Sequence, residues 1–126
     1  MNAEVIPARQ LLCLLEDTAA GLCADTAAID LLARHDHFLH QRAFRRFVAT
    51  STTMFGGQPA AVIRWVPAVN ALDAGLLPAS TSEQAVLRIA ASLGDDDIAV
   101  HLRQVLGSLD HTNITLVTRA ITTANR

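Results

Sequence analysis

Apolar and polar residues follow one another along most of this chain with the three- and four-residue spacing of helices that bury one face. The first such stretch starts near Pro7 and ends near Gly21, residue types that commonly open and close helices. A second stretch starts at Asp25 or Thr26, either of which can cap a helix N-terminus. The beginning of the chain therefore predicts two helices joined by a short turn.

The segment after the second helix holds four of the ten arginines and three of the five histidines. It either breaks near Asp36 or runs as a single helix over residues 34–48. A single helix would place Leu39 and Phe44 on an apolar side, with the arginines and Phe38 on the opposite side. This segment is where charge, candidate metal ligands and an aromatic side chain gather.

Residues 50–58 are expected to form a loop, since hydroxyl and β-branched residues weaken a helix and two adjacent glycines break it. The next apolar stretch, residues 59–74, has helical spacing, and Pro67 inside it predicts a Pro-kinked helix near residue 67. A strand over residues 60–66, followed by a turn, is the alternative interpretation.

Side chains typical of N-caps mark the starts of the remaining helices. Ser80 and Glu83 have the spacing of a capping box, and the helix that they open is expected to end at Gly94. The acidic run 95–97 is expected to cap a short helix, and Asp110 to cap the last one.

Together these stretches predict an all-α fold, a compact bundle of five to six helices that forms a single helical domain over residues 1–126. Apolar residues make up 51% of the chain and aromatic residues 4%, a balance that suits tightly packed aliphatic helices. Cys13 and Cys23 lack metal-binding spacing, and we expect both to be reduced and buried.

The N-terminus lacks the basic start and apolar core of a signal peptide, and no run approaches the roughly 18 apolar residues of a membrane span. We therefore expect a soluble, cytoplasmic protein that does not contact a membrane. Arginine replaces lysine throughout and alanine is abundant, which is typical of GC-rich bacterial genomes.

The net charge of −2 conceals a basic segment between two acidic ones. Residues 34–46 carry a net charge of +3, whereas residues 1–33 and residues 73–110 carry −4 each. This layout favours charge pairing within the chain or between copies at least as well as nucleic-acid binding.

Motifs that carry chemistry are sparse. His37 and His40 would share one helical face, with Asp36 or His111 completing a zinc site, but no recognised ligand motif is present. The glycine-containing stretch 53–59 could cradle an anion, yet the chain has no lysine and no P-loop spacing. No catalytic motif appears either. We therefore predict no enzymatic activity, no metal and no cofactor.

Two other functions stay open as alternatives. Nucleic acid could bind the arginines of a 34–48 helix, and Ala90, Gly94 and Val100 have part of the helix-turn-helix spacing, although three aspartates before the second helix would repel phosphate. A small ligand could bind beside Trp65, where a helix kink would open a groove.

The function that we favour is a non-catalytic protein-interaction module that self-associates or binds a helical partner. The charge layout supports it, as does an excess of apolar residues over recognisable chemistry. Arginine and aromatic residues are common in interface hot spots. The predicted partner-binding residues are Phe38, Arg42, Arg45 and Arg46.

Overall fold

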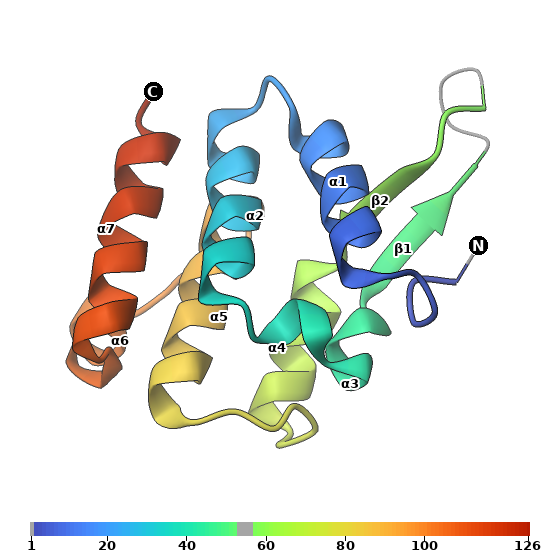
Figure 1. Ribbon diagram of the computed structural model, residues 1–126. Coiled ribbons are helices and arrows are strands. Elements are labelled where there is room, and N and C mark those ends of the chain that lie inside the picture. Colours follow the sequence, from blue (N-terminus) through green and yellow to red (C-terminus); the bar gives the residue numbers. More distant parts are fainter. Residues whose placement is uncertain (1, 53–56) are drawn as a thin grey trace.

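Helix α2 lies at the centre of the fold, with α1 on one side, α7 on the other and α5 behind it (Figure 1). The computed structural model describes residues 2–52 and 57–126. The elements of this part of the chain are α1 (Ala8–Ala19), α2 (Cys23–His35), the short 3-10 helix η1 (Phe38–His40), α3 (Arg42–Arg45), β1 (Val48–Ser51), β2 (Ala60–Ile63), α4 (Trp65–Asp73), α5 (Thr81–Gly94), α6 (Leu102–Ser108) and α7 (His111–Ala124). The predicted all-α class and compact packing are confirmed, with seven α-helices among the described residues rather than five or six.

The sequence of α2 explains its central position. Ala27 and Ala28 are both fully buried, and small side chains let neighbouring helices approach closely. Leu31 and Leu32 fill the space around them and are also almost completely buried. The buried apolar residues of the described chain belong to one hydrophobic cluster around this helix.

The predicted caps of α5 and α7 are confirmed. The Ser80 hydroxyl accepts a hydrogen bond from the Glu83 amide at 3.2 Å, and the Glu83 carboxylate accepts one from the Ser80 amide at 2.7 Å. At α7, the Asp110 carboxylate accepts a hydrogen bond from the Asn113 amide at 2.8 Å. These side chains satisfy amides that have no partner within their helices.

The predicted kinked helix over residues 59–74 is wrong, and the alternative strand is present as β2. The strand pairs antiparallel with β1, and Ile63 faces Val48 in the register. Helix α4 begins only at Trp65, so Pro67 lies in its first turn. A proline there lacks only an amide that has no helical partner anyway, and it does not bend the helix.

Three smaller predictions also need correction. Cys13 and Cys23 are exposed rather than buried, because Cys13 lies outside the apolar stripe of α1 and Cys23 opens α2. The acidic run 95–97 does not cap α6, whose N-cap residue is His101. Residues 95–101 separate α5 from α6, a longer connection than the three- or four-residue turn of a helix-turn-helix.

Candidate functional site

The predicted helix over residues 34–48 does not exist as one helix. The chain leaves α2 at Asp36, which adopts a left-handed conformation with φ of 57°. It then forms η1, α3 and β1 in quick succession. The faces assigned to the segment on the basis of a single helix are therefore wrong, although the predicted break near Asp36 is confirmed.

Phe38 lies in the hydrophobic core, with no exposed surface. Its ring packs against Phe44 with a centroid distance of 5.6 Å and meets His37 edge-on at 4.8 Å. The short η1 turn rotates Phe38 inward, away from the arginines with which a continuous helix would have grouped it. In this fold Phe38 therefore offers no exposed surface for the partner contact that the sequence predicted.

Arg45 binds the backbone of its own chain. Its Nε donates to the carbonyl of Leu39 at 2.7 Å, and its Nη1 donates to the carbonyl of Ile6 at 2.6 Å. One side chain thereby joins the N-terminal segment to η1. This arrangement gives Arg45 a structural role in the folded chain.

Arg42, which begins α3, and Arg46, which follows it, both extend toward Glu4. Their Nε atoms lie 3.3 and 3.5 Å from one oxygen of the Glu4 carboxylate. Their side chains are 78% and 67% exposed, so solvent screens both pairs. The structure thus brings the two arginines together on the surface, and their partner-binding role stays a prediction.

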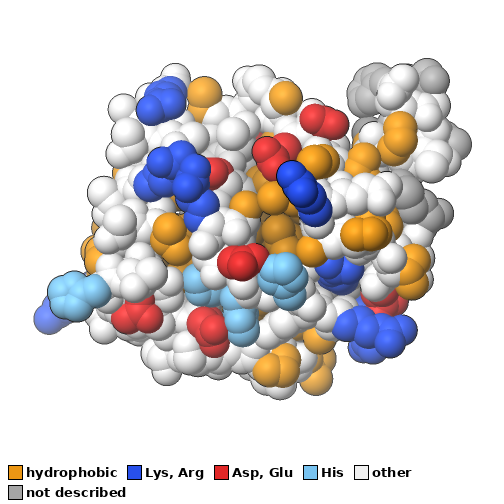
Figure 2. Space-filling view, viewed as in Figure 1, with side chains coloured by type: hydrophobic (Ala, Val, Ile, Leu, Met, Phe, Trp, Pro, Cys, Tyr) orange, Lys and Arg blue, Asp and Glu red, His pale blue; other side chains and the backbone are white. Residues whose placement is uncertain are grey.

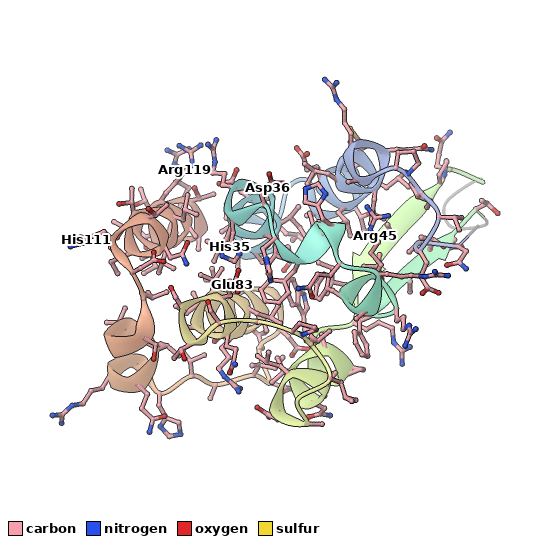
Figure 3. The ribbon with its side chains drawn as sticks, turned by 60° about the horizontal axis from the view of Figure 1, so that its bottom comes forward. His35, Asp36, Arg45, Glu83, His111 and Arg119 are labelled. Carbon is pink, nitrogen blue, oxygen red and sulfur yellow. The ribbon has the colours of Figure 1, made fainter. Side chains whose placement is uncertain are left out.

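A second group of polar side chains fills the region where the C-terminal end of α2 meets the N-termini of α5 and α7. We call this group the polar seam. It comprises His35, His37, Gln41, Ser82, Glu83, Asp110 and Asn113. In Figure 3, His35 and Glu83 lie close together at its centre, whereas His111 points away from the molecule.

His37 holds two parts of the seam together. Its Nδ1 lies 3.0 Å from a Glu83 carboxylate oxygen, and its Nε2 lies 2.9 Å from the side-chain nitrogen of Gln41. If Nδ1 carries the proton and donates to Glu83, Nε2 accepts from Gln41, whose amide also donates to the carbonyl of Pro78 at 2.7 Å. In this tautomer both ring nitrogens of His37 have a hydrogen-bond partner.

Ser82 joins the other side of the seam. Its hydroxyl oxygen lies 3.1 Å from the backbone amide of Asp110 and 2.8 Å from the side-chain amide of Asn113, and it accepts from both. Asn113 is a buried polar residue of the helical core. These bonds fix the start of α7 against the start of α5.

Two residues of the seam have shifted pKa values, for different reasons. Burial acts chiefly on His35. It lowers the pKa of His35 from the usual 6.5, and the neighbouring His37 lowers it further, against the opposing effect of nearby carboxylates. The pKa of Glu83 is also lowered, chiefly because its carboxylate accepts the Ser80 amide. His35 Nδ1 and Gln41 Oε1 are sealed from solvent and have no partner among the described residues, an arrangement that costs roughly 1–3 kcal/mol per group.

The residues considered for a zinc site do not come together. His37 faces Glu83, His40 pairs with Asp36 at 2.6 Å, and His111 is exposed at the start of α7. Among the residues that the structure describes, no three histidine, cysteine, aspartate or glutamate side chains form a metal-binding group. The anion cradle considered for residues 53–59 falls largely on residues 53–56, which lie outside the described chain.

Helix α7 has an unusual outer surface. We define its outer face as Ile114, Thr115, Thr118, Ile121 and Thr122. The three threonines each donate to the carbonyl four residues earlier, at 3.2, 2.8 and 3.1 Å. Their hydroxyl protons are thus used within the helix, and Ile121 is 52% exposed.

The inner side of α7 differs from this outer face. Arg119, whose side chain is 53% exposed, lies at the border between the two sides and reaches across to Asp30 of α2 at 3.3 Å. Asp30 also pairs with Arg34 at 3.0 Å. Val117 and Ala120 are buried against the neighbouring helices. Along the edge of the molecule where α7 lies, Figure 2 shows uncharged side chains interrupted by arginine, histidine and acidic side chains.

A pocket of about 280 Å³ lies beside Trp65, the residue next to which the sequence suggested a ligand site. Its apolar walls include Leu15, Ile29 and Ile63, and Asp25 and Asp95 contribute carboxylates. The pocket is formed where β2 and the start of α4 meet α1, α2 and the end of α5, without any helix kink.

Sequence reasoning missed the role of Gly94, which it assigned only to ending α5. A side-chain carbon at this position would overlap the indole of Trp65. The glycine therefore makes room for the tryptophan at the edge of the pocket. Nothing in the local sequence signals this, since the two residues are far apart in the chain.

Comparison of the chain with models of protein families, with curated proteins and with solved structures finds no match. None of the helices described in the structure has the combined length and apolar character that crossing a bilayer requires.

Proposed function

We propose that this protein is a non-catalytic helical module that self-associates through the outer face of α7. The observation that carries the proposal is that the outer face of this edge helix consists of isoleucines and of threonines whose hydroxyl donors are already used. A surface helix usually presents charged side chains to water. A second helix covering this face would bury the exposed part of Ile121 together with the threonine methyl groups.

The composition of α7 supports a packed environment on both sides. Eight of its fourteen residues are β-branched, and such residues lose side-chain freedom in a helix. A helix of this composition depends on packing for its stability. Within the described chain, α7 packs chiefly on α2 and to a smaller extent on α5.

A second copy of the chain is the occupant that the charges favour. A two-fold interface requires that a surface complement itself. In an antiparallel pair of α7 helices centred on Thr118, Ile121 of one copy would lie opposite Thr115 of the other, and Ile114 opposite Thr122. The same register brings Asp110 of each copy toward Arg126 of the other, and it sets the two helix dipoles antiparallel.

The geometry of the arginine-rich segment supports a role in partner binding less well than the outer face of α7 does. Arg45 is bound to backbone carbonyls, and Arg42 and Arg46 already share Glu4. The nucleic-acid alternative depended on the same arginines lying along one continuous helix, and it gains no support from this geometry.

Sedimentation velocity over a range of concentrations tests the proposal. Ile121→Arg places two like charges near the centre of the interface, and we expect it to weaken dimerisation by about tenfold or more. Leu76→Arg is the matched control, because Leu76 is 68% exposed and lies away from α7. Arg42→Glu combined with Arg46→Glu should leave the mass unchanged. A wild-type protein that stays monomeric, or a dimer lost only in the arginine variant, would overturn the proposal.

A further inference from the structure

The pocket beside Trp65 contains two carboxylates without a counter-charge. Asp25 and Asp95 both line it, and neither forms an ion pair with any described residue. Among the described residues, the Asp95 carboxylate accepts a hydrogen bond only from the backbone amide of Asp97, at 2.8 Å. Several other carboxylates are paired, such as Glu4 with two arginines and Asp73 with Arg88.

Trp65 adds an unused hydrogen-bond donor to the same pocket. Its side chain is only 8% exposed, and its indole nitrogen has no hydrogen-bond partner within the described chain. Among the described residues, the side-chain polar atoms that are sealed from solvent and lack a hydrogen-bond partner are His35 Nδ1 and Gln41 Oε1. The indole nitrogen is not among them, so it is at least partly accessible. It lies against Gly94, which lines the pocket together with Trp65. Buried tryptophans usually find an acceptor for this proton.

The remaining walls give the pocket its apolar character. Leu15, Ile29 and Ile63 contribute aliphatic side chains, and Thr18 uses its hydroxyl to donate to the carbonyl of Leu14 at 2.9 Å. A volume of about 280 Å³ is at the small end for ligand sites, which suits a molecule smaller than a typical drug.

We propose that this pocket binds a small protonated amine that carries an acceptor oxygen. The ammonium group would lie between the carboxylates of Asp25 and Asp95, the apolar body would contact the aliphatic wall, and the oxygen would accept the proton of the Trp65 indole. Charged hydrogen bonds of this kind are the stronger ones in proteins, and they are strengthened where water is excluded. The proposal does not depend on self-association through α7.

Trp65 is itself the reporter for the test. It is the single tryptophan of the chain, which has no tyrosine, so the intrinsic emission of the protein comes from this site. The probe is methoxypropylammonium, titrated into the 126-residue protein while the emission is recorded. Two molecules of the same size separate its features: pentylammonium keeps the charge without the oxygen, and butyl methyl ether keeps the oxygen without the charge.

We expect the probe to shift the emission with a dissociation constant on the order of millimolar, as befits so small a ligand. Pentylammonium should bind about fivefold more weakly, and the uncharged ether about tenfold more weakly or worse. An ether that binds as well as the probe would overturn the proposal, as would an emission that no probe changes.

Variants of the protein test the carboxylates independently. Asp25→Asn and Asp95→Asn should each weaken binding of the probe by about tenfold. Asp96→Asn is the matched control, because it removes the same charge from the neighbouring exposed position, which does not line the pocket. Circular dichroism confirms that each variant is folded. Equal weakening in all three variants would indicate only general attraction to an acidic surface and would overturn the assignment of the site.

Discussion

The arginine-rich segment and the outer face of α7 both lie at the surface, and they differ in what their polar groups contact. In the arginine-rich segment, side chains bind carbonyls and carboxylates of the same chain. On the outer face of α7, the threonine hydroxyls donate only within their own helix, and no charged side chain belongs to the face. The density of chemical groups in a segment therefore does not mark a contact surface. What matters is the surface that remains after the polar groups have paired within the chain, which on the outer face of α7 consists of threonine methyl groups and the exposed part of Ile121.

The largest effect that distinguishes the two regions is expected at Phe38. If Phe38 is core, Phe38→Ala should lower the free energy of unfolding by roughly 3–5 kcal/mol, because it leaves a cavity where the ring was. Urea-induced unfolding measures this loss, with the exposed Leu76→Ala as a control that should change little. A loss at Phe38 as small as that at Leu76 would return Phe38 to the surface and revive its predicted contact role.

Arg45 should show the next largest effect. Arg45→Ala removes two charged hydrogen bonds to the carbonyls of Leu39 and Ile6, and we expect a loss of roughly 2–4 kcal/mol in the free energy of unfolding. The same unfolding experiment measures it. Wild-type stability in the variant, accompanied by a change in oligomeric mass, would show that Arg45 serves an interface instead.

The polar seam should make stability depend on pH. Because the pKa of His35 is lower in the folded protein than the usual 6.5, the unfolded chain binds more protons below that pH. The free energy of unfolding should therefore be greatest above pH 6.5 and should fall as the pH drops through the lowered pKa of the folded state. Denaturant unfolding at about pH 7.5 and about pH 5 measures the difference.

His35→Leu tests the origin of this dependence. The substitution removes the titrating group, so the decrease in stability toward acid should become smaller. His101→Leu changes an exposed histidine and should preserve the wild-type dependence. An identical pH dependence in wild type and His35→Leu would assign the effect to other groups.

The smallest effect is expected at the exposed arginines. Arg42→Ala and Arg46→Ala should each change the free energy of unfolding by no more than about 0.5 kcal/mol, since exposed ion pairs contribute little. If either variant lost as much free energy of unfolding as Arg45→Ala, Arg42 and Arg46 would not be surface residues of little structural importance. Addition of salt should reduce whatever contribution the two arginines make.

The sequence correctly predicted features of the fold that depend only on residues close together in the chain. The capping box at Ser80 and Glu83, the cap at Asp110 and the break near Asp36 all act over a few residues, and all three are confirmed. Pro67 misled the prediction because a proline has different consequences inside a helix and in its first turn. Whether Pro67 kinks a helix therefore depends on where that helix starts, and the apolar pattern of residues 59–74 did not determine the start.

Which side chains are buried and which are exposed depends on contacts between residues far apart in the chain, and the local sequence does not reveal these contacts. The core position of Phe38 follows from the η1 turn, which a continuous helical pattern does not reveal. The bond from Arg45 to Ile6 and the clearance that Gly94 gives Trp65 each join residues far apart in the chain. The outer face of α7 could have been noticed from its threonine content, but its exposure follows from the position of α7 at the edge of the fold (Figure 1).

Cysteine cross-linking at Thr118 tests self-association through α7 most directly. Cys13 and Cys23 are exposed and are first replaced by serine, so that the introduced thiol is the one that reacts. In an antiparallel pair centred on Thr118, the two Thr118→Cys thiols face each other, and mild oxidation should give a covalent dimer. Thr112→Cys, exposed on another side of α7, should not cross-link. No cross-link at Thr118, or equal cross-linking at both positions, would contradict the proposed interface.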